Sequence, residues 1–79
     1  MQLNEAISKR ILELCTERGL TQYGLSAKSG VPQSTLSTIL RCTFPSMKIR
    51  IIYEICEGLE ISLLEFFDSP LFERENIMD

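Results

Sequence analysis

Apolar residues recur at intervals of three and four along most of the chain, the spacing of residues on one face of an α-helix. The first such segment spans residues 4–18 and has this spacing at Ile7, Ile11 and Leu14. Asn4 can cap its start, and Gly19 can end it, because glycine adopts the left-handed conformation that closes many helices.

Two shorter helices are predicted next, over residues 22–29 and 33–41. Thr21 is a suitable cap for the first of them. The turn between them reads Gly30-Val31-Pro32. Proline is tolerated where a helix begins, because the N–H group that it lacks would have no helical partner there.

After a predicted loop from Thr43 to Ser46, the pattern indicates two more helices. One covers residues 47–59, where residues 49–52 could also form a short strand but the later spacing favours a helix. The other begins after Ser62, with Glu65 at the capping-box position. The predicted fold class is therefore all-α, a compact globule of five helices followed by a tail, residues 69–79.

The stretch LTQYGLSAKSGVPQSTLSTIL, residues 20–40, resembles the helix-turn-helix of the Cro and lambda-repressor-like (XRE-type) family. Gly30 falls on the turn glycine of that motif, where a positive φ suits glycine. Apolar residues occupy the positions where the motif requires them: Leu25, Val31, Leu36 and Ile39. The flanks RGLTQ and IYEICEGLEISLLEFF extend the resemblance to about residues 3–68, so residues 1–68 are expected to form the DNA-binding domain, with the motif at its second and third helices.

The resemblance implies sequence-specific binding of double-stranded DNA by a small transcriptional regulator, a repressor by expectation, with residues 33–41 in the major groove. Outward residues of this helix (together with Pro32) are expected to read bases: Gln33, Ser34, Ser37 and Thr38. Phosphate contacts are expected from Gln22, Lys28, Arg41 and Thr43. The amide of Gln33 can pair with adenine through two hydrogen bonds. The alternative for all these residues is an ordinary solvated helix face.

Several positions depart from the family pattern. Cys42 and Glu60 replace the glycines that usually close two of the helices, and Ser26 replaces an alanine. We expect the hydroxyl of Ser26 to bond to the backbone. Cys15 and Leu40 stand where many members carry a buried arginine–glutamate pair, so these two side chains are expected to touch.

The distribution of charge favours DNA binding, although the net charge is −3. Residues 1–50 hold seven cations and three carboxylates, whereas residues 51–79 hold one cation and eight carboxylates. No acidic residue lies between Arg18 and Arg50. Because a phosphate-binding face needs positive potential only locally, an acidic protein can bind DNA. A chance asymmetry is the alternative.

Other classes of chemistry find little support in the sequence. With no histidine and no C-x-x-C pair, neither a zinc site nor a histidine-activated nucleophile is expected. Cys15, Cys42 and Cys56 are expected to be free thiols, with a redox-sensing Cys42 as the lesser alternative. No cofactor, metal or small-molecule ligand is expected, and no catalytic residue. No membrane span or signal-peptide pattern is present, so a cytoplasmic location is expected.

The tail carries more large apolar side chains than a disordered segment needs: Leu71, Phe72, Ile77 and Met78. Two alternatives follow. The tail folds back on its own chain, or it covers a partner's fifth helix in a homodimer, and the homodimer is the favoured expectation. Because of its acidic C-terminal half, the fold could also serve as a protein-binding module such as an antitoxin or anti-repressor.

Overall fold

The longest helix, α1 (Leu3–Arg18), begins two residues earlier than the cap predicted at Asn4 requires. The computed structural model describes residues 1–43 and 46–79. Gln2 is the N-cap, and its backbone N–H donates to Glu5 Oε1 at 3.0 Å. Asn4 therefore lies within the first turn, and its predicted capping role is wrong. Gly19 ends the helix with a φ of 64°, as predicted.

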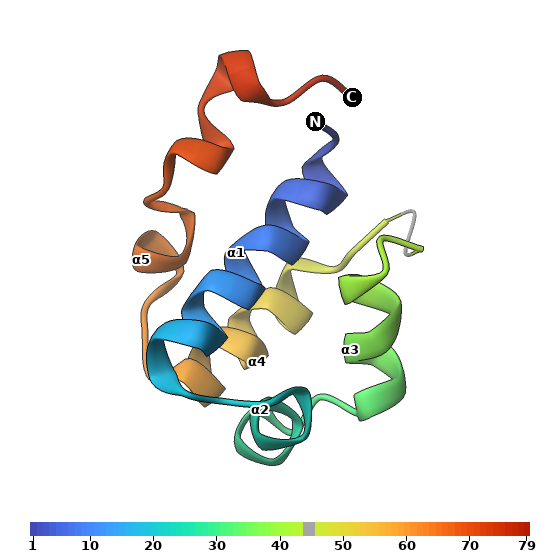
Figure 1. Cartoon of the computed structure of the whole chain (residues 1–79), viewed down its shortest axis with the longest axis vertical. Helices are drawn as coiled ribbons and strands as arrows, with labels where there is room; N and C mark the ends of the chain where they lie inside the picture. The colour runs from blue at the N-terminus through green and yellow to red at the C-terminus, as the bar shows by residue number, and fades with distance from the viewer. Residues whose placement is uncertain (44–45) are drawn as a thin grey trace.

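Helices α2 (Gln22–Ser29) and α3 (Gln33–Leu40) form the predicted helix-turn-helix, at the bottom and right of Figure 1. Thr21 Oγ1 accepts a hydrogen bond from the N–H of Gly24 at 3.0 Å, which confirms the predicted cap. Gly30 adopts a φ of 77° at the turn. The hydroxyl of Ser26 donates to the carbonyl of Val31 at 2.7 Å, which confirms its expected bond to the backbone and fixes the turn.

Helix α4 (Ile49–Leu59) begins two residues later than predicted, and α5 (Leu63–Phe67) follows after Ser62, whose hydroxyl accepts from the N–H of Glu65. Residues 44–45 of the predicted preceding loop lie outside the described residues. Glu60 closes α4 with φ 59° and ψ 42°, and Cys42 follows α3 with φ 58°. Both residues thus adopt the left-handed conformation that the missing glycines would favour.

The core lies between α1 and α4, which cross the middle of the molecule (Figure 1), and the inner faces of the other helices. Close approach of α2 to α4 depends on Gly58, because a Cβ atom there would lie 2.7 Å from Ser29 Cβ. The largest side chains with almost no exposure are Ile11, Leu25, Leu36, Ile39, Ile55 and Phe66. These residues fix the angle at which α2 and α3 stand on the globule.

Two arginines of α1 bond to the C-terminal ends of other helices. Arg10 Nε donates to the carbonyl of Phe66 at 2.7 Å, and Arg10 Nη2 to that of Glu65 at 2.8 Å. Arg18 Nε donates to the carbonyl of Leu59 at 3.1 Å. A cation at a helix C-terminus is stabilising, because the last carbonyls lack helical partners and carry partial negative charge.

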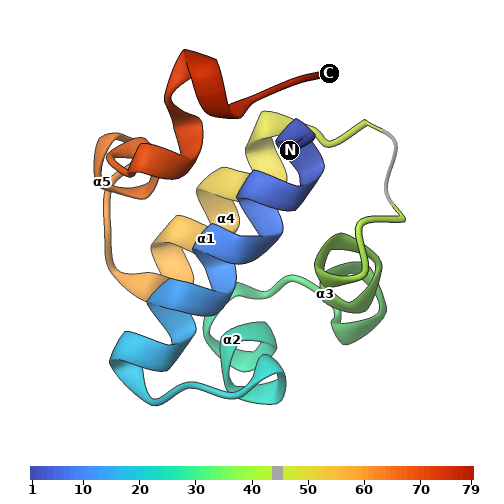
Figure 2. The ribbon, with the colours of Figure 1, turned by 45° about the horizontal axis from the view of Figure 1, so that its top comes forward.

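The tail folds back on its own chain through two 3₁₀ turns, η1 (Pro70–Phe72) and η2 (Arg74–Asn76). The ring of Phe72 lies 4.9 Å from that of Phe67, and Met78 N–H donates to the carbonyl of Met1 at 2.8 Å. Figure 2 shows the last residues returning beside the start of α1. The single chain thus adopts the fold-back alternative. Leu71, Phe72 and Ile77 are half-buried and Met78 is exposed, and a dimer role for these four residues stays a prediction.

Candidate DNA-binding interface

Helix α3 presents a polar face to solvent and an apolar face to the core. Leu36 and Ile39 are buried, whereas Gln33 and Ser34 are exposed and Ser37 and Thr38 are half-buried. The outward placement expected from the helical period is therefore confirmed for Gln33 and Ser34, whereas Ser37 and Thr38 are partly covered. What these side chains can offer to DNA depends on the hydrogen bonds that they already make.

The side chain of Gln22, at the start of α2, is joined to α3. Its Nε2 donates to Ser37 Oγ at 3.0 Å and to the carbonyl of Gln33 at 3.3 Å. These two bonds use both hydrogens of the amide nitrogen, so the side chain has no donor left for a phosphate. The N–H of Gly24 is used by Thr21, but the backbone N–H groups of Gln22 and Tyr23 have no helical partner and can supply the expected phosphate contact instead.

The C-terminal end of α3 brings together several of the expected residues. Thr38 Oγ1 donates to the carbonyl of Ser34 at 2.7 Å, and Thr43 Oγ1 donates to that of Thr38 at 3.2 Å. Arg41 Nε donates to the carbonyl of Ser37 at 3.3 Å, and the side chain is otherwise exposed. Its two remaining nitrogens can therefore reach an anion in solvent.

Lys28 is exposed but lies apart from this group. It lines a shallow hollow with Arg18 and Glu60, where α1 and α4 end. Lys28 therefore lies where α2 packs against α4, whereas the other residues expected to contact phosphate lie at α3 or at its two ends.

Three exposed residues near the motif were not assigned a role from the sequence. Lys48 and Arg50 stand at the start of α4, just after the segment that follows α3, and Tyr23 lies in the first turn of α2 with 62% of its surface exposed. The sequence could have indicated a DNA contact for the two cations, because they follow the motif directly in a stretch without carboxylates.

Residues 10–70 match the model of the Cro/C1-type HTH DNA-binding domain. The chain belongs to the Cro/C1-type helix-turn-helix family. Its function is DNA-binding regulation of transcription, as the match and the arrangement of α2 and α3 support.

Solved structures agree with the family assignment. The wild-type restriction-modification controller protein C.Esp1396I is 31% identical, with a TM-score of 0.76 over 86% of this chain and 87% of that one. A tyrosine-to-phenylalanine mutant of that protein gives 0.77 at the same identity and coverage, and a structure of its nucleoprotein complex gives 0.76. No curated protein matches this chain.

The thiols of this Cro/C1-type domain have distinct environments. Cys15 and Cys56 are buried and free, and Cys42 is exposed and free. Burial raises the pKa of the Cys56 thiol to about 11 and also raises the pKa of Cys15, because a thiolate is poorly solvated in the core. Among residues 1–43 and 46–79, no group of acidic or cysteine side chains is placed to hold a metal ion.

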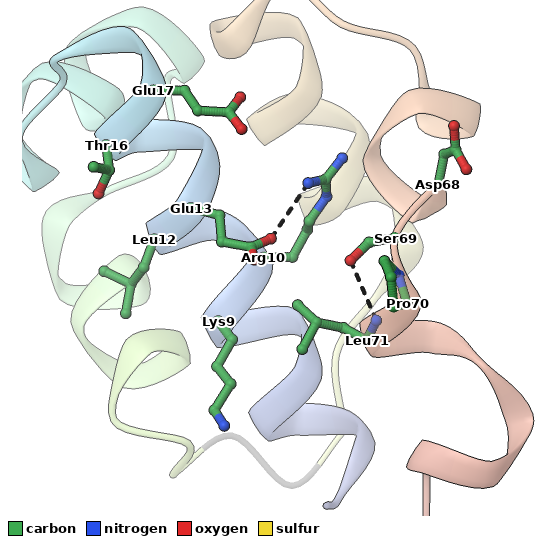
Figure 3. Close-up of a pocket in the computed structure, with 10 residues that line it drawn as sticks. All are labelled: Lys9, Arg10, Leu12, Glu13, Thr16, Glu17, Asp68, Ser69, Pro70 and Leu71. Carbon is green, nitrogen blue, oxygen red and sulfur yellow. Dashed lines mark hydrogen bonds and ion pairs between the residues drawn. The ribbon is translucent and has the colours of Figure 1, made fainter.

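An open groove of about 680 Å³ lies between α1 and the segment that runs from the end of α5 into η1 (Figure 3). Leu12 and Leu71 supply its apolar part, and Lys9, Glu13 and Glu17 give it charges of both signs. None of the residues that line this groove comes from α2 or α3. No helix in the described part of the chain is long and apolar enough to span a membrane.

Proposed function

We propose that α3 enters the major groove of double-stranded DNA and that its outward side chains read the base sequence. The observation that carries this proposal is the division of α3 into a buried apolar face and an outward polar face, held at a fixed angle by its packing on the core and by the bonds of Gln22. A helix fits the major groove, where all four base pairs present different donors and acceptors.

Gln33 is the strongest candidate for a base contact. Its side chain is exposed at the first turn of α3 and carries both a donor and an acceptor, so it can pair with the N6 and N7 atoms of adenine. Ser34, Ser37 and Thr38 are proposed to read neighbouring bases. Contacts to phosphate are proposed for Arg41, for Thr43, for the backbone at Gln22 and, from its separate position, for Lys28.

Binding measurements on selected duplexes test these roles. Gln33→Ala should weaken binding by about 1–3 kcal/mol at one base pair and affect random DNA little. Lys28→Ala should weaken binding to all sequences alike and reduce the salt dependence by about one phosphate contact. The matched control is Lys9→Ala, which removes the same charge beside the groove of Figure 3. An equal loss on specific and random DNA for Gln33→Ala would exclude its reading role.

We also propose a homodimer that binds a two-fold symmetric operator. One such domain reads few base pairs, and two copies would place their recognition helices about 34 Å apart, one turn of DNA. Leu64 on α5 is 83% exposed, and Met78 in the tail is 77% exposed, which leaves apolar surface at the C-terminal end for a second chain. Sedimentation at micromolar concentration tests this. A 9.0 kDa chain that stays monomeric both free and on DNA excludes the dimer.

We propose that this regulator represses transcription in the cytoplasm, without catalysis, cofactor or small-molecule effector. The same retention assay addresses the alternative of a protein-binding module. Retention on DNA that falls steeply with salt supports the regulator, and no retention at any salt supports the protein-binding module.

A further inference from the structure

Ser37 and Thr38 are adjacent hydroxyl residues on the reading face of α3, but their hydroxyl groups are in opposite hydrogen-bonding states. A hydroxyl has one hydrogen to donate and two lone pairs that accept. A neighbour that uses the hydrogen leaves only acceptors for DNA, whereas a neighbour that occupies a lone pair leaves the hydrogen. The contacts of each residue therefore decide which bases it can select.

The orientation of the Gln22 amide is fixed by the carbonyl of Gln33. A carbonyl oxygen can only accept, so the nitrogen of the amide, not its oxygen, must face it, at 3.3 Å. The same nitrogen lies 3.0 Å from Ser37 Oγ and directs its second hydrogen there. Ser37 is thus an acceptor toward Gln22. Among the described residues its hydroxyl donates to no protein group, so its hydrogen is available to DNA.

Thr38 shows the reverse arrangement. Its hydroxyl hydrogen is used on the carbonyl of Ser34, one turn earlier in α3, at 2.7 Å. The oxygen of Thr38 therefore offers only lone pairs to a base. Its bond lies within α3 and does not involve Gln22, which makes Thr38 an internal comparison for Ser37.

We propose that Gln22 is a positioning residue that makes Ser37 a hydrogen-bond donor to DNA, and that Ser37 thereby selects against cytosine at the base that it faces. In the major groove adenine, guanine and thymine each present an acceptor, whereas cytosine presents only its N4 amino donor. Thr38, as an acceptor, discriminates in the opposite direction, against guanine and thymine, which present no donor there. This inference rests on the proposed placement of α3 in the major groove.

Selection of bound duplexes from a randomised library, with the full chain, tests the inference. Ser37→Ala identifies the base position that Ser37 reads, because the preference at that position disappears. Gln22→Met keeps the length of the side chain but removes the donor. It should relax the exclusion of cytosine at that position by about two- to tenfold, the contribution of one hydrogen bond. The preference at the position that Thr38→Val identifies should stay unchanged.

A second substitution provides the opposite change at the same site. In Gln22→Glu the carboxylate can only accept, so Ser37 would donate to it and present lone pairs to DNA. The preference at the position of Ser37 should then shift toward cytosine or adenine, while overall affinity falls because a negative charge lies near phosphate. Melting of each variant separately reports whether the domain stays folded.

The outcomes separate this inference from the proposed function. If the wild-type protein enriches no sequence, the proposed function fails and this inference fails with it. If the wild-type protein enriches a site but Ser37→Ala changes no position, or if both Gln22 variants keep the exclusion of cytosine, the inference alone is wrong. Relaxation in Gln22→Met together with inversion in Gln22→Glu supports it, because loss of general stability would not invert a preference at one position.

Discussion

Replacement of Glu60 by glycine should stabilise the protein. Glu60 closes α4 with φ 59° and ψ 42°, a conformation that costs a residue with a Cβ atom about 1–2 kcal/mol. Glycine relieves this strain, but it also increases the entropy of the unfolded chain, which offsets about 0.4–1 kcal/mol. The net gain from the backbone is about 0.5–1 kcal/mol, which raises the Tm of a domain of this size by about 2–8 °C.

The negative charge of Glu60 contributes separately. It lies at the C-terminus of α4, where the helix dipole disfavours an anion by about 0.3–1 kcal/mol at low salt. The matched control is Glu60→Gln, which removes the charge and keeps the strained Cβ atom. Its gain should shrink as salt screens the dipole, whereas the additional gain of Glu60→Gly over Glu60→Gln should not depend on salt.

Thermal and urea unfolding of the three proteins at two salt concentrations measure both terms. Cys42→Gly offers an independent site with the same strain, since Cys42 has a φ of 58° after α3. Equal melting temperatures for Glu60→Gly and Glu60→Gln would show that charge alone acts at this position. A lower Tm for Glu60→Gly than for the parent would refute the strain argument as a whole.

Three further predictions concern the interior. Arg10→Lys keeps the charge but cannot span the two carbonyls at the end of α5, so it should lower the free energy of unfolding by about 1–3 kcal/mol in urea, and an unchanged value would contradict this role. Leu40 is half-buried against the core, so Leu40→Glu should place a charge there without a partner and destabilise the protein by several kcal/mol. A melting curve like that of the parent would show that the site is exposed. Because the pKa of Cys56 is raised in the folded protein to about 11 from an ordinary 9.0, the thiol ionises first in the unfolded chain. The free energy of unfolding should therefore fall as the pH rises from about 9 to 11, and it should fall less in Cys56→Ala. A thiol reagent at pH 8 should label only Cys42 in the folded protein.

Features that depend on a few neighbouring residues could be predicted from the sequence. Thr21 and Ser62 cap their helices as predicted, because an N-cap bond joins residues only three apart. The positive φ of Gly30 followed from the register of the motif, and so did that of Glu60. The start of α1 was predicted wrongly: Gln2 and Glu5 bond there across three residues, and Asp79 Oδ1 also accepts from the N–H of Leu3, a contact across the whole chain.

The features of the candidate site also divide into those that the sequence predicts and those that depend on contacts between helices. The helical period placed Gln33 and Ser34 outward, and the structure agrees. The expected contact between Cys15 and Leu40 stays a prediction, although both side chains pack against the same core. The bond between Gln22 and Ser37 depends on the distance between two helices, which no spacing along the chain expresses. The family resemblance implied a phosphate contact for Gln22, whereas the structure joins its side chain to α3.

Some of the cations behind the charge asymmetry that favoured DNA binding have a structural role instead. Arg10 and Arg18 contribute to the positive N-terminal half, but both are bonded to the carbonyl ends of α5 and α4. The exposed cations that follow α3 along the chain are instead Arg41, Lys48 and Arg50. More decisive than their number is the absence of carboxylates along the chain between Arg18 and Arg50, which leaves α2 and α3 themselves without negative side chains. The exception in space is Asp79 of the tail, which lines a hollow with Thr43 just beyond α3. Charges beyond about 10 Å are largely screened at physiological salt, so the acidic C-terminal half can coexist with a DNA-binding face.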